Sequence, residues 1–403
     1  MKWQYSGGGQ KSEGELQRLV ETVIQADDFD KSHFTDYSVK RELKALDEHN
    51  TPVGIFSVKD GWKSGSVKIR LPKEDTMYAS ESHAPEFEVH GIWYRSLISI
   101  IKSADEDTTQ KHFHNIPFKL FRRASSDTEL EDLPSGDSDS ERVWADLYTS
   151  DALLEEQEKI DALPRNPEDD ETVEYVIAPI MGYSDSTHLT SFGTAYLWPF
   201  YTWIGALSKY MRAKPSNFAA HHTAYIPKLP QLIQDFYHKT YGTAATLNIM
   251  RFCRSELMQK VWDLLLDTEF MHAFKHGILV TCADGIRRRL FPRFLTYSAD
   301  YPERVALTCI RFLGRCPCPT CLVEKKNIAL MGSKRNSAGS RKSRVDDEST
   351  QGLIARARSW IFERGYRLTS KMVERILKPL SLLPTRFMGS QACRGSCSQG
   401  DVQ

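Results

Sequence analysis

The pattern of apolar and polar residues changes along the chain, and each change predicts a structural element. An amphipathic repeat over residues 15–24 predicts a short helix, and residues 51–71 predict two strands joined by a turn. Residues 173–181 are almost all apolar and partly β-branched, which is typical of a buried strand. The strongest helical pattern covers residues 255–276, and Gly277 is a natural helix end.

More strand patterns follow in the middle of the chain. They cover residues 196–203, 278–282 and 290–297. Pro302 is placed to open a helix that runs through Phe312, because proline is favoured in the first turn. Strands that alternate with helices indicate the α/β class. Two helical segments come later, at residues 352–362 and 370–379.

These patterns divide the chain into four regions. Residues 1–124 form a small α+β region, and residues 125–170 form an acidic, partly disordered linker with a short helix at 153–163. The α/β core occupies residues 171–326. Residues 327–403 contain a polar linker, the late helical segments and a tail without apolar periodicity.

Composition favours a globular intracellular protein. The 403 residues are 40% hydrophobic and 11% aromatic, which is enough for at least one core. No apolar run is long enough to cross a membrane, and the first residues lack the pattern of a secretion signal. Eight cysteines are too sparse for a disulfide framework in a chain of this length, which favours a reducing compartment.

The formal net charge of zero conceals two segments of opposite charge. Residues 125–175 contain 18 acidic and 3 basic residues, a charge of −15, whereas residues 201–300 contain 13 basic and 7 acidic residues, a charge of +6. DNA would be repelled by the first segment and attracted by the second. For charge alone, ordinary solvated surface is the favoured explanation, so charge does not identify a partner.

Two acidic residues stand at the ends of predicted buried strands. Asp185 follows the strand at 173–181, and Asp300 follows the strand at 290–297. Carboxylates at neighbouring strand ends can share Mg²⁺ ions that activate water or a 3′-hydroxyl and stabilise the leaving oxygen of a phosphodiester. This is the arrangement of an RNase H-like nuclease. The alternative is structural, since Asp at a strand end often forms a turn or caps a helix.

Seven short phrases occur here in the order found in Plavaka-type transposases, fungal relatives of the CACTA cut-and-paste elements. They are Ser184–Thr190, Trp198–Tyr201, Ser208–Ser216, Ala224–Pro230, Asp284–Arg289, Tyr297–Glu303 and Cys316–Cys321. One such phrase would be weak, but seven in order form a specific signal. The chain therefore resembles this family most strongly between Ser184 and Cys321.

The resemblance implies an RNase H-like, mixed-sheet core with insertions and an acidic triad of the DDE type. Asp185 and Asp300 match the first two members of that triad. It also implies DNA cleavage and strand transfer by two-metal chemistry, with Mg²⁺ or Mn²⁺ as cofactor and transposon ends as the DNA partner. The implied location is the nucleus. A dimer or higher oligomer fits a transposase, but the sequence leaves the oligomeric state open.

Three cysteines form a cluster with the spacing of a metal site. Cys316, Cys318 and Cys321 suit a thiolate-bound ion, and structural Zn²⁺ is the ion expected. Buried or free thiols are the alternative. A fourth ligand would have to come from His276, Cys282, Cys393 or Cys397, or be absent.

Two basic phrases flank the expected site in sequence and are candidates for phosphate contacts. Their residues are Lys209, Arg212, Lys214, Arg287, Arg288 and Arg289. Ordinary surface charge is the alternative for each phrase. Four aromatic residues nearby could stack on bases, although packing in the core is the favoured interpretation. They are Trp198, Phe200, Tyr201 and Trp203.

The sequence departs from the family after residues 381–385. Residues 389–400 match no family element, no histidine follows His276, and no acid in a matching context supplies the third member of the triad. We therefore expect a truncated catalytic set and little or no strand transfer. Two other functions stay open. One is an inactive remnant that binds nucleic acid or protein, and the other is an unrelated interaction protein with a zinc knuckle and an acidic loop.

Overall fold

The structure is a computed structural model, and the residues it describes are 17, 19–27, 29–35, 37–38, 41, 60–123, 140–188, 196–330, 332–333 and 342–387. The chain forms two compact units, and each is described by itself. Unit 1 comprises Met1–Asp60 and Ser186–Leu197, and unit 2 comprises Gly61–Asp185 and Trp198–Gln403.

The described part of unit 1 contains only short elements. Val20–Ile24 form a π-helical turn in the region where the amphipathic pattern predicts a helix, and Lys31–Phe34 form a 3-10 turn. The strands β6 (Thr187–His188) and β7 (Tyr196–Leu197) pair in antiparallel orientation.

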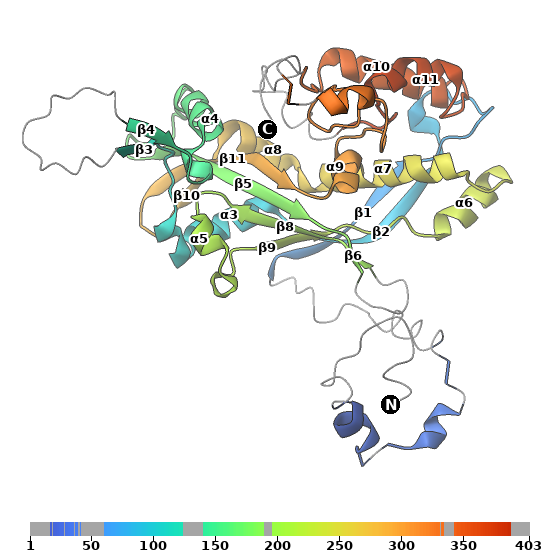
Figure 1. Cartoon of the computed structure of the whole chain (residues 1–403), viewed down its shortest axis with the longest axis horizontal. Coiled ribbons are helices and arrows are strands. Elements are labelled where there is room, and N and C mark those ends of the chain that lie inside the picture. The colour runs from blue at the N-terminus through green and yellow to red at the C-terminus, as the bar shows by residue number, and fades with distance from the viewer. Residues whose placement is uncertain are drawn as a thin grey trace, which may run out of the picture. The chain divides into compact units, whose positions relative to one another are not determined.

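Unit 2 is built on a curled mixed sheet of seven strands (Figure 1). In order across the sheet, they are β1 (Trp62–Arg70), β2 (Glu86–Arg95), β9 (His221–Tyr225), β8 (Pro199–Ile204), β5 (Glu174–Ser184), β11 (Arg287–Ser298) and β10 (Ile278–Thr281). Neighbouring strands are antiparallel except for β5 and β11, which are parallel. Of the strand pair predicted at residues 51–71, β1 is the second strand, and residues 51–59 lie outside the described part.

The long helix α7 (Leu247–Leu265) packs its apolar side into the main core of unit 2. The helix predicted at residues 255–276 is in fact two helices, α7 and α8 (Thr268–His276). The break occurs because the Asp267 side chain caps α8 by accepting a hydrogen bond from the Phe270 amide at 2.8 Å. As predicted, α8 ends at Gly277, whose φ of 68° favours glycine.

The remaining helices of unit 2 surround this core. They are α3 (Leu97–Glu106), α4 (Asp151–Asp161), α5 (Lys209–Arg212), α6 (Leu232–Tyr241), α9 (Tyr301–Leu307), α10 (Glu348–Phe362) and α11 (Lys371–Leu377). A separate ribbon consists of β3 (Leu120–Arg123) and β4 (Ser140–Val143). The helix expected from Pro302 to Phe312 stops at Leu307, and positive φ angles follow at Cys309 and Leu313. No helix among the described residues is long and apolar enough to span a bilayer.

The predicted mixed α/β fold is confirmed, but its parts are less separate than the sequence pattern indicates. Strands β1 and β2, from the predicted amino-terminal region, belong to the same sheet as the core strands, since β2 pairs with β9. The predicted boundaries at residues 124, 170 and 326 all fall within unit 2.

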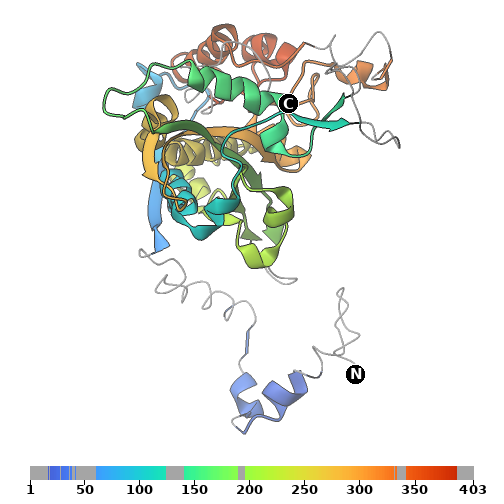
Figure 2. The ribbon, with the colours of Figure 1, turned by 90° about the vertical axis from the view of Figure 1, so that its left-hand side faces the viewer.

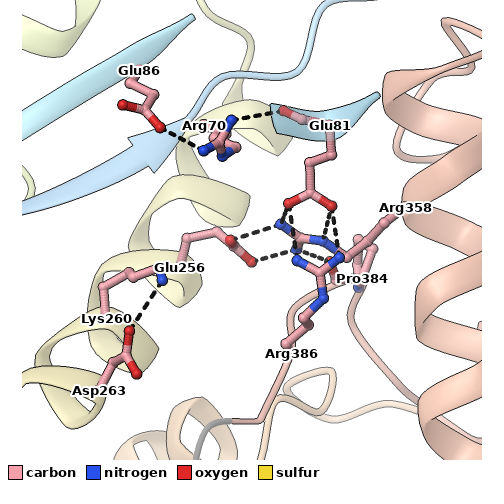
Figure 3. Close-up of polar contacts among 9 residues, drawn as sticks. All are labelled: Arg70, Glu81, Glu86, Glu256, Lys260, Asp263, Arg358, Pro384 and Arg386. Carbon is pink, nitrogen blue, oxygen red and sulfur yellow. Dashed lines mark hydrogen bonds and ion pairs between the residues drawn. The ribbon is translucent and has the colours of Figure 1, made fainter. Parts of the chain in front are cut away.

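A buried ion-pair network connects α10 to the rest of unit 2 (Figure 3). The Arg358 side chain is only 2% exposed and binds the carboxylates of Glu81 and Glu256, while Arg386 binds Glu81 as well. Glu81 lies in a 3-10 turn between β1 and β2, and Glu256 lies in α7. In Figures 1 and 2, α10 and α11 accordingly lie together at the top of unit 2, on the α7 side of the sheet.

Candidate active site at the ends of strands β5 and β11

The parallel pairing of β5 and β11 brings two sequence-distant aspartates to one edge of the sheet. The last paired residues are Tyr183 of β5 and Ser298 of β11. Asp185 and Asp300 each follow two residues after these partners, so they leave the two strands at equivalent positions. Neighbouring strands lie about 4.8 Å apart, so the two acids emerge from adjacent strand ends.

Asp300 has a structural role in this arrangement. It is the N-cap residue of α9, and its Oδ1 accepts a hydrogen bond from the Glu303 amide at 2.9 Å. The helix-cap alternative considered for Asp300 is thus confirmed. A carboxylate has about four acceptor positions, however, and the residue is exposed, so capping leaves room for a second ligand.

Asp185 is also exposed, and its Oδ2 accepts a hydrogen bond from the Tyr183 hydroxyl at 3.3 Å. Burial and the nearby Asp185 charge raise the pKa of Tyr183, so its hydroxyl stays protonated and remains a donor. The Asp185 carboxylate itself stays exposed to solvent. The side chain is therefore held in place while it stays accessible.

Glu303 is a third carboxyl group at this edge, and the sequence analysis did not identify it as a site residue. It lies in the first turn of α9, is 5% exposed, and accepts a hydrogen bond from the Trp198 indole at 3.0 Å. Burial raises the pKa of Glu303 to about 7, and the charges of Asp300 and Asp185 add to the effect. The sequence signal that could have drawn attention to Glu303 is the spacing Asp300-x-x-Glu303, which is typical of a helix start.

Tight packing fixes the two strands beneath the site. Gly182 of β5 lies against the Tyr297 ring of β11, and a Cβ atom at Gly182 would approach that ring to 2.8 Å. The Ser184 and Tyr297 hydroxyls are hydrogen-bonded, and the Tyr297 ring stacks on Phe200 at 5.8 Å. Phe200 is fully buried, which agrees with the interpretation of this residue as core.

The site offers oxygen ligands, which suit Mg²⁺ or Mn²⁺, and such ions are commonly held by one or two carboxylates plus substrate phosphate and water. Across the described residues, no three His, Cys, Asp or Glu side chains are arranged to hold one ion. Asp185 and Asp300 thus fit the role of a pair that would complete a metal site together with DNA, and this role stays a prediction.

The three cysteines of the predicted zinc cluster lie near the guanidinium group of Arg344. Arg344 donates hydrogen bonds to the carbonyl oxygens of Cys316 at 3.0 Å and Cys318 at 3.3 Å. All three cysteines are close enough to influence the pKa of Arg344, which burial lowers. Cys316 and Cys321 are buried, and Cys318 is half-buried.

None of the possible fourth zinc ligands is identified by the structure. Cys282 is buried elsewhere, with its Sγ atom 4.0 Å from Oδ1 of Asp105, and His276 is exposed at the end of α8. Cys393 and Cys397 lie outside the described residues. Burial raises the pKa of Cys316, whereas hydrogen bonds from Thr320 and Cys321 outweigh burial and lower that of Cys318. Zinc binding stays a prediction.

The arginines of the second basic phrase are paired with acidic side chains. Arg289 binds Asp169 at 2.5 Å, and Arg287 binds Asp170 at 2.7 Å. Arg288 is 4% exposed and binds Glu174 and Asp284, each at 2.8 Å. A DNA phosphate would have to displace these carboxylates to reach the guanidinium groups.

The first basic phrase is only partly available. Arg212 binds Asp146 at 2.8 Å, and Lys209 Nζ donates to the Ala145 carbonyl at 2.9 Å. Lys214 is exposed, and it makes no ion pair with any residue that the structure describes. Of the six predicted DNA-binding residues, Lys214 is therefore the freest, and phosphate binding by all six stays a prediction.

A family model gives an independent comparison. The model described as Plavaka transposase matches residues 55–360, a range that includes the carboxyl groups at the ends of β5 and β11 as well as the cysteine cluster. No match was found among curated proteins, and none among solved structures.

Proposed function

We propose that this chain, which belongs to the Plavaka transposase family, binds transposon DNA in the nucleus and cleaves it with Asp185 and Asp300 as the catalytic carboxylates. Family membership establishes a transposase-derived protein, and the cleavage site is our proposal. The observation that carries it is the register of β5 and β11, which places these two acids at equivalent positions of neighbouring parallel strands.

The strand order supports an RNase H-like core for this chemistry. Strands β5, β8 and β9 form an antiparallel series, and β11 then returns parallel to β5 on its other side. Asp185 and Asp300 would hold Mg²⁺ or Mn²⁺, which supplies Lewis acidity for attack on a phosphodiester when it is bound. Glu303, buried beside them, adds a carboxyl group that can hold a proton near neutral pH.

The sequence matches no third acid of the family triad, so the reaction proposed here is DNA nicking, with little strand transfer. A second candidate is a protein that binds DNA without cutting it. The burial of Glu303 favours that candidate, because it raises the pKa of this carboxyl group to about 7 and a protonated carboxyl group is a poor metal ligand.

A plasmid-nicking assay with the full chain and Mg²⁺ or Mn²⁺ tests the proposal. Asp185→Asn and Asp300→Asn remove a charge, and Asn at position 300 still caps α9 because Asn and Asp are equally good N-caps. We expect each variant to lose about 100-fold or more of the nicking rate. The matched control is Asp263→Asn, which changes an exposed acid of α7 and should leave the rate unchanged.

The outcomes separate the two candidates. Nicking that depends on both aspartates supports the cleavage function. Nicking at equal rates in all variants contradicts the assigned site. An absence of nicking together with salt-dependent binding of DNA favours the non-cleaving candidate.

A further inference from the structure

The face of the sheet that points away from α7 carries several ring side chains. Phe200 of β8 points toward α7, where its ring centroid lies 5.1 Å from that of Trp262. Successive side chains of a strand point to opposite faces, so Tyr201 and Trp203 of β8 point away from α7. Tyr183 of β5 is paired with Tyr201 and shares its face.

These rings form a continuous series across the strands. The centroids of Tyr183 and Tyr201 are 6.2 Å apart, and those of Tyr201 and His222 are 4.6 Å apart. Tyr225 lies 6.3 Å from His222 and stacks on Trp62 at 5.5 Å. The series, called the aromatic row below, consists of Trp203, Tyr183, Tyr201, His222, Tyr225 and Trp62.

The rings of the aromatic row are accessible for most of its length. His222 is exposed, and Tyr183, Tyr201, Trp203 and Tyr225 are half-exposed, whereas Trp62 is buried at the far end. Burial and the charge of a nearby arginine lower the pKa of His222, so this ring is neutral at pH 7. The row thus presents uncharged, flat rings on one side of the sheet.

Positive charge borders the aromatic row. The Arg95 guanidinium lies 6.0 Å from the Trp62 ring centroid, and its charge adds to burial in lowering the pKa of both His221 and His222. Among the described residues, no carboxylate lies within ion-pair distance of Arg95. A cation at the Trp62 end of the row, without an acidic partner in the part of the chain that the structure describes, suits a ligand that has both flat apolar groups and negative charge.

The aromatic row begins at the candidate active site. The Tyr183 hydroxyl donates to the Asp185 carboxylate at 3.3 Å, so one residue belongs to both features. A DNA strand with its reacting phosphate at Asp185 would continue along the face of the sheet that carries the aromatic row. In Figure 1, this face of β5, β8 and β9 is opposite to α7, α10 and α11.

We propose that the aromatic row binds unpaired bases of a DNA strand next to the cleavage site. This inference rests on the proposed function, because the aromatic row lies next to the cleavage site only if Asp185 is part of that site. Unpaired bases expose their π-faces and can stack on tyrosine, tryptophan and histidine rings, whereas bases within a duplex are already stacked on each other. Arg95 neutralises a phosphate of the same strand.

Binding of single-stranded DNA without divalent cations tests this inference. A labelled oligothymidylate of about 20 nucleotides and a duplex of equal length are titrated into the full chain in EDTA. The double substitution Tyr201→Ala and Trp203→Ala should weaken binding of the single strand by at least about tenfold. Tyr201→Phe keeps the ring and should bind normally. The control is Trp144→Ala, which removes a 62% exposed indole outside the row.

A second measurement needs no variant. An oligonucleotide that contains 2-aminopurine should lose fluorescence on binding to the unmodified protein if its bases stack on rings. Unchanged single-strand affinity in the double variant overturns the inference, and so does unquenched 2-aminopurine. A third outcome would also overturn the inference. In it, the unmodified protein does not bind the single strand, and the double variant changes its oligomeric state. A second copy of the chain would then occupy this face.

The two proposals fail separately. Asp185→Asn and Asp300→Asn should retain binding of the oligothymidylate, since stacking needs no metal. Aspartate-dependent nicking with ring-independent binding refutes only the inference about the aromatic row. Ring-dependent binding without nicking refutes only the cleavage function.

Discussion

Replacing Arg358 tests how far the buried ion-pair network determines the stability of unit 2. Its guanidinium makes hydrogen bonds of 2.5 to 3.0 Å to the carboxylates of Glu81 and Glu256 and to the Pro384 carbonyl. Arg358→Met keeps much of the side-chain volume but leaves Glu256 buried without its positive partner. Removal of one partner from a buried ion pair costs about 3 to 5 kcal/mol.

The pKa of Glu81 shows how strongly Arg358 and Arg386 together stabilise its carboxylate. Although burial opposes the effect, hydrogen bonds and charges of Arg358 and Arg386 lower this pKa from 4.5 to about 2. A shift of this size corresponds to roughly 3 kcal/mol. The stabilisation is fully present above pH 4.5, and it is lost as pH falls through the folded-state pKa of about 2. In Arg358→Met, Arg386 alone should preserve only part of this stabilisation of the Glu81 carboxylate.

Urea denaturation at several pH values measures both effects. At pH 7 we expect Arg358→Met to lower the free energy of unfolding by about 3 to 5 kcal/mol, and the difference from the unmodified protein should shrink toward pH 2. Arg367→Met is the matched control, because Arg367 is 69% exposed and its pair with Glu74 should contribute less than about 1 kcal/mol. Equal stabilities of the two variants would refute this account of the network.

Two further predictions concern other parts of unit 2. Gly182→Ala should lower the free energy of unfolding by about 1 to 3 kcal/mol in thermal or urea melts, because its Cβ would meet the Tyr297 ring at 2.8 Å. Burial raises the pKa of Asp105 from 3.8 to about 7, so its contribution to stability should fall by roughly 3 kcal/mol as pH rises from 5 to 8. Asp105→Asn should flatten this dependence, and an unchanged pH profile in the variant would contradict the assignment to Asp105.

The sequence by itself determined the local elements and the positions of the two aspartates. Apolar runs and helix signals correctly predicted β5, β11 and α4, and they also predicted the end of α8 at Gly277. These features depend on neighbours within a few residues, so a local pattern contains the necessary information. The two strand patterns also identified Asp185 and Asp300 as residues that follow buried strands.

Only the tertiary structure decided which distant groups meet. The parallel register of β5 and β11 gives the two aspartates equivalent positions, and the turn into α9 buries Glu303 beside them. The sequence marked Arg288 and Arg289 as basic, but only the fold revealed their acidic partners, more than 100 residues away in the case of Asp169. Burial and charge pairing depend on long-range packing, which no local pattern of residues encodes.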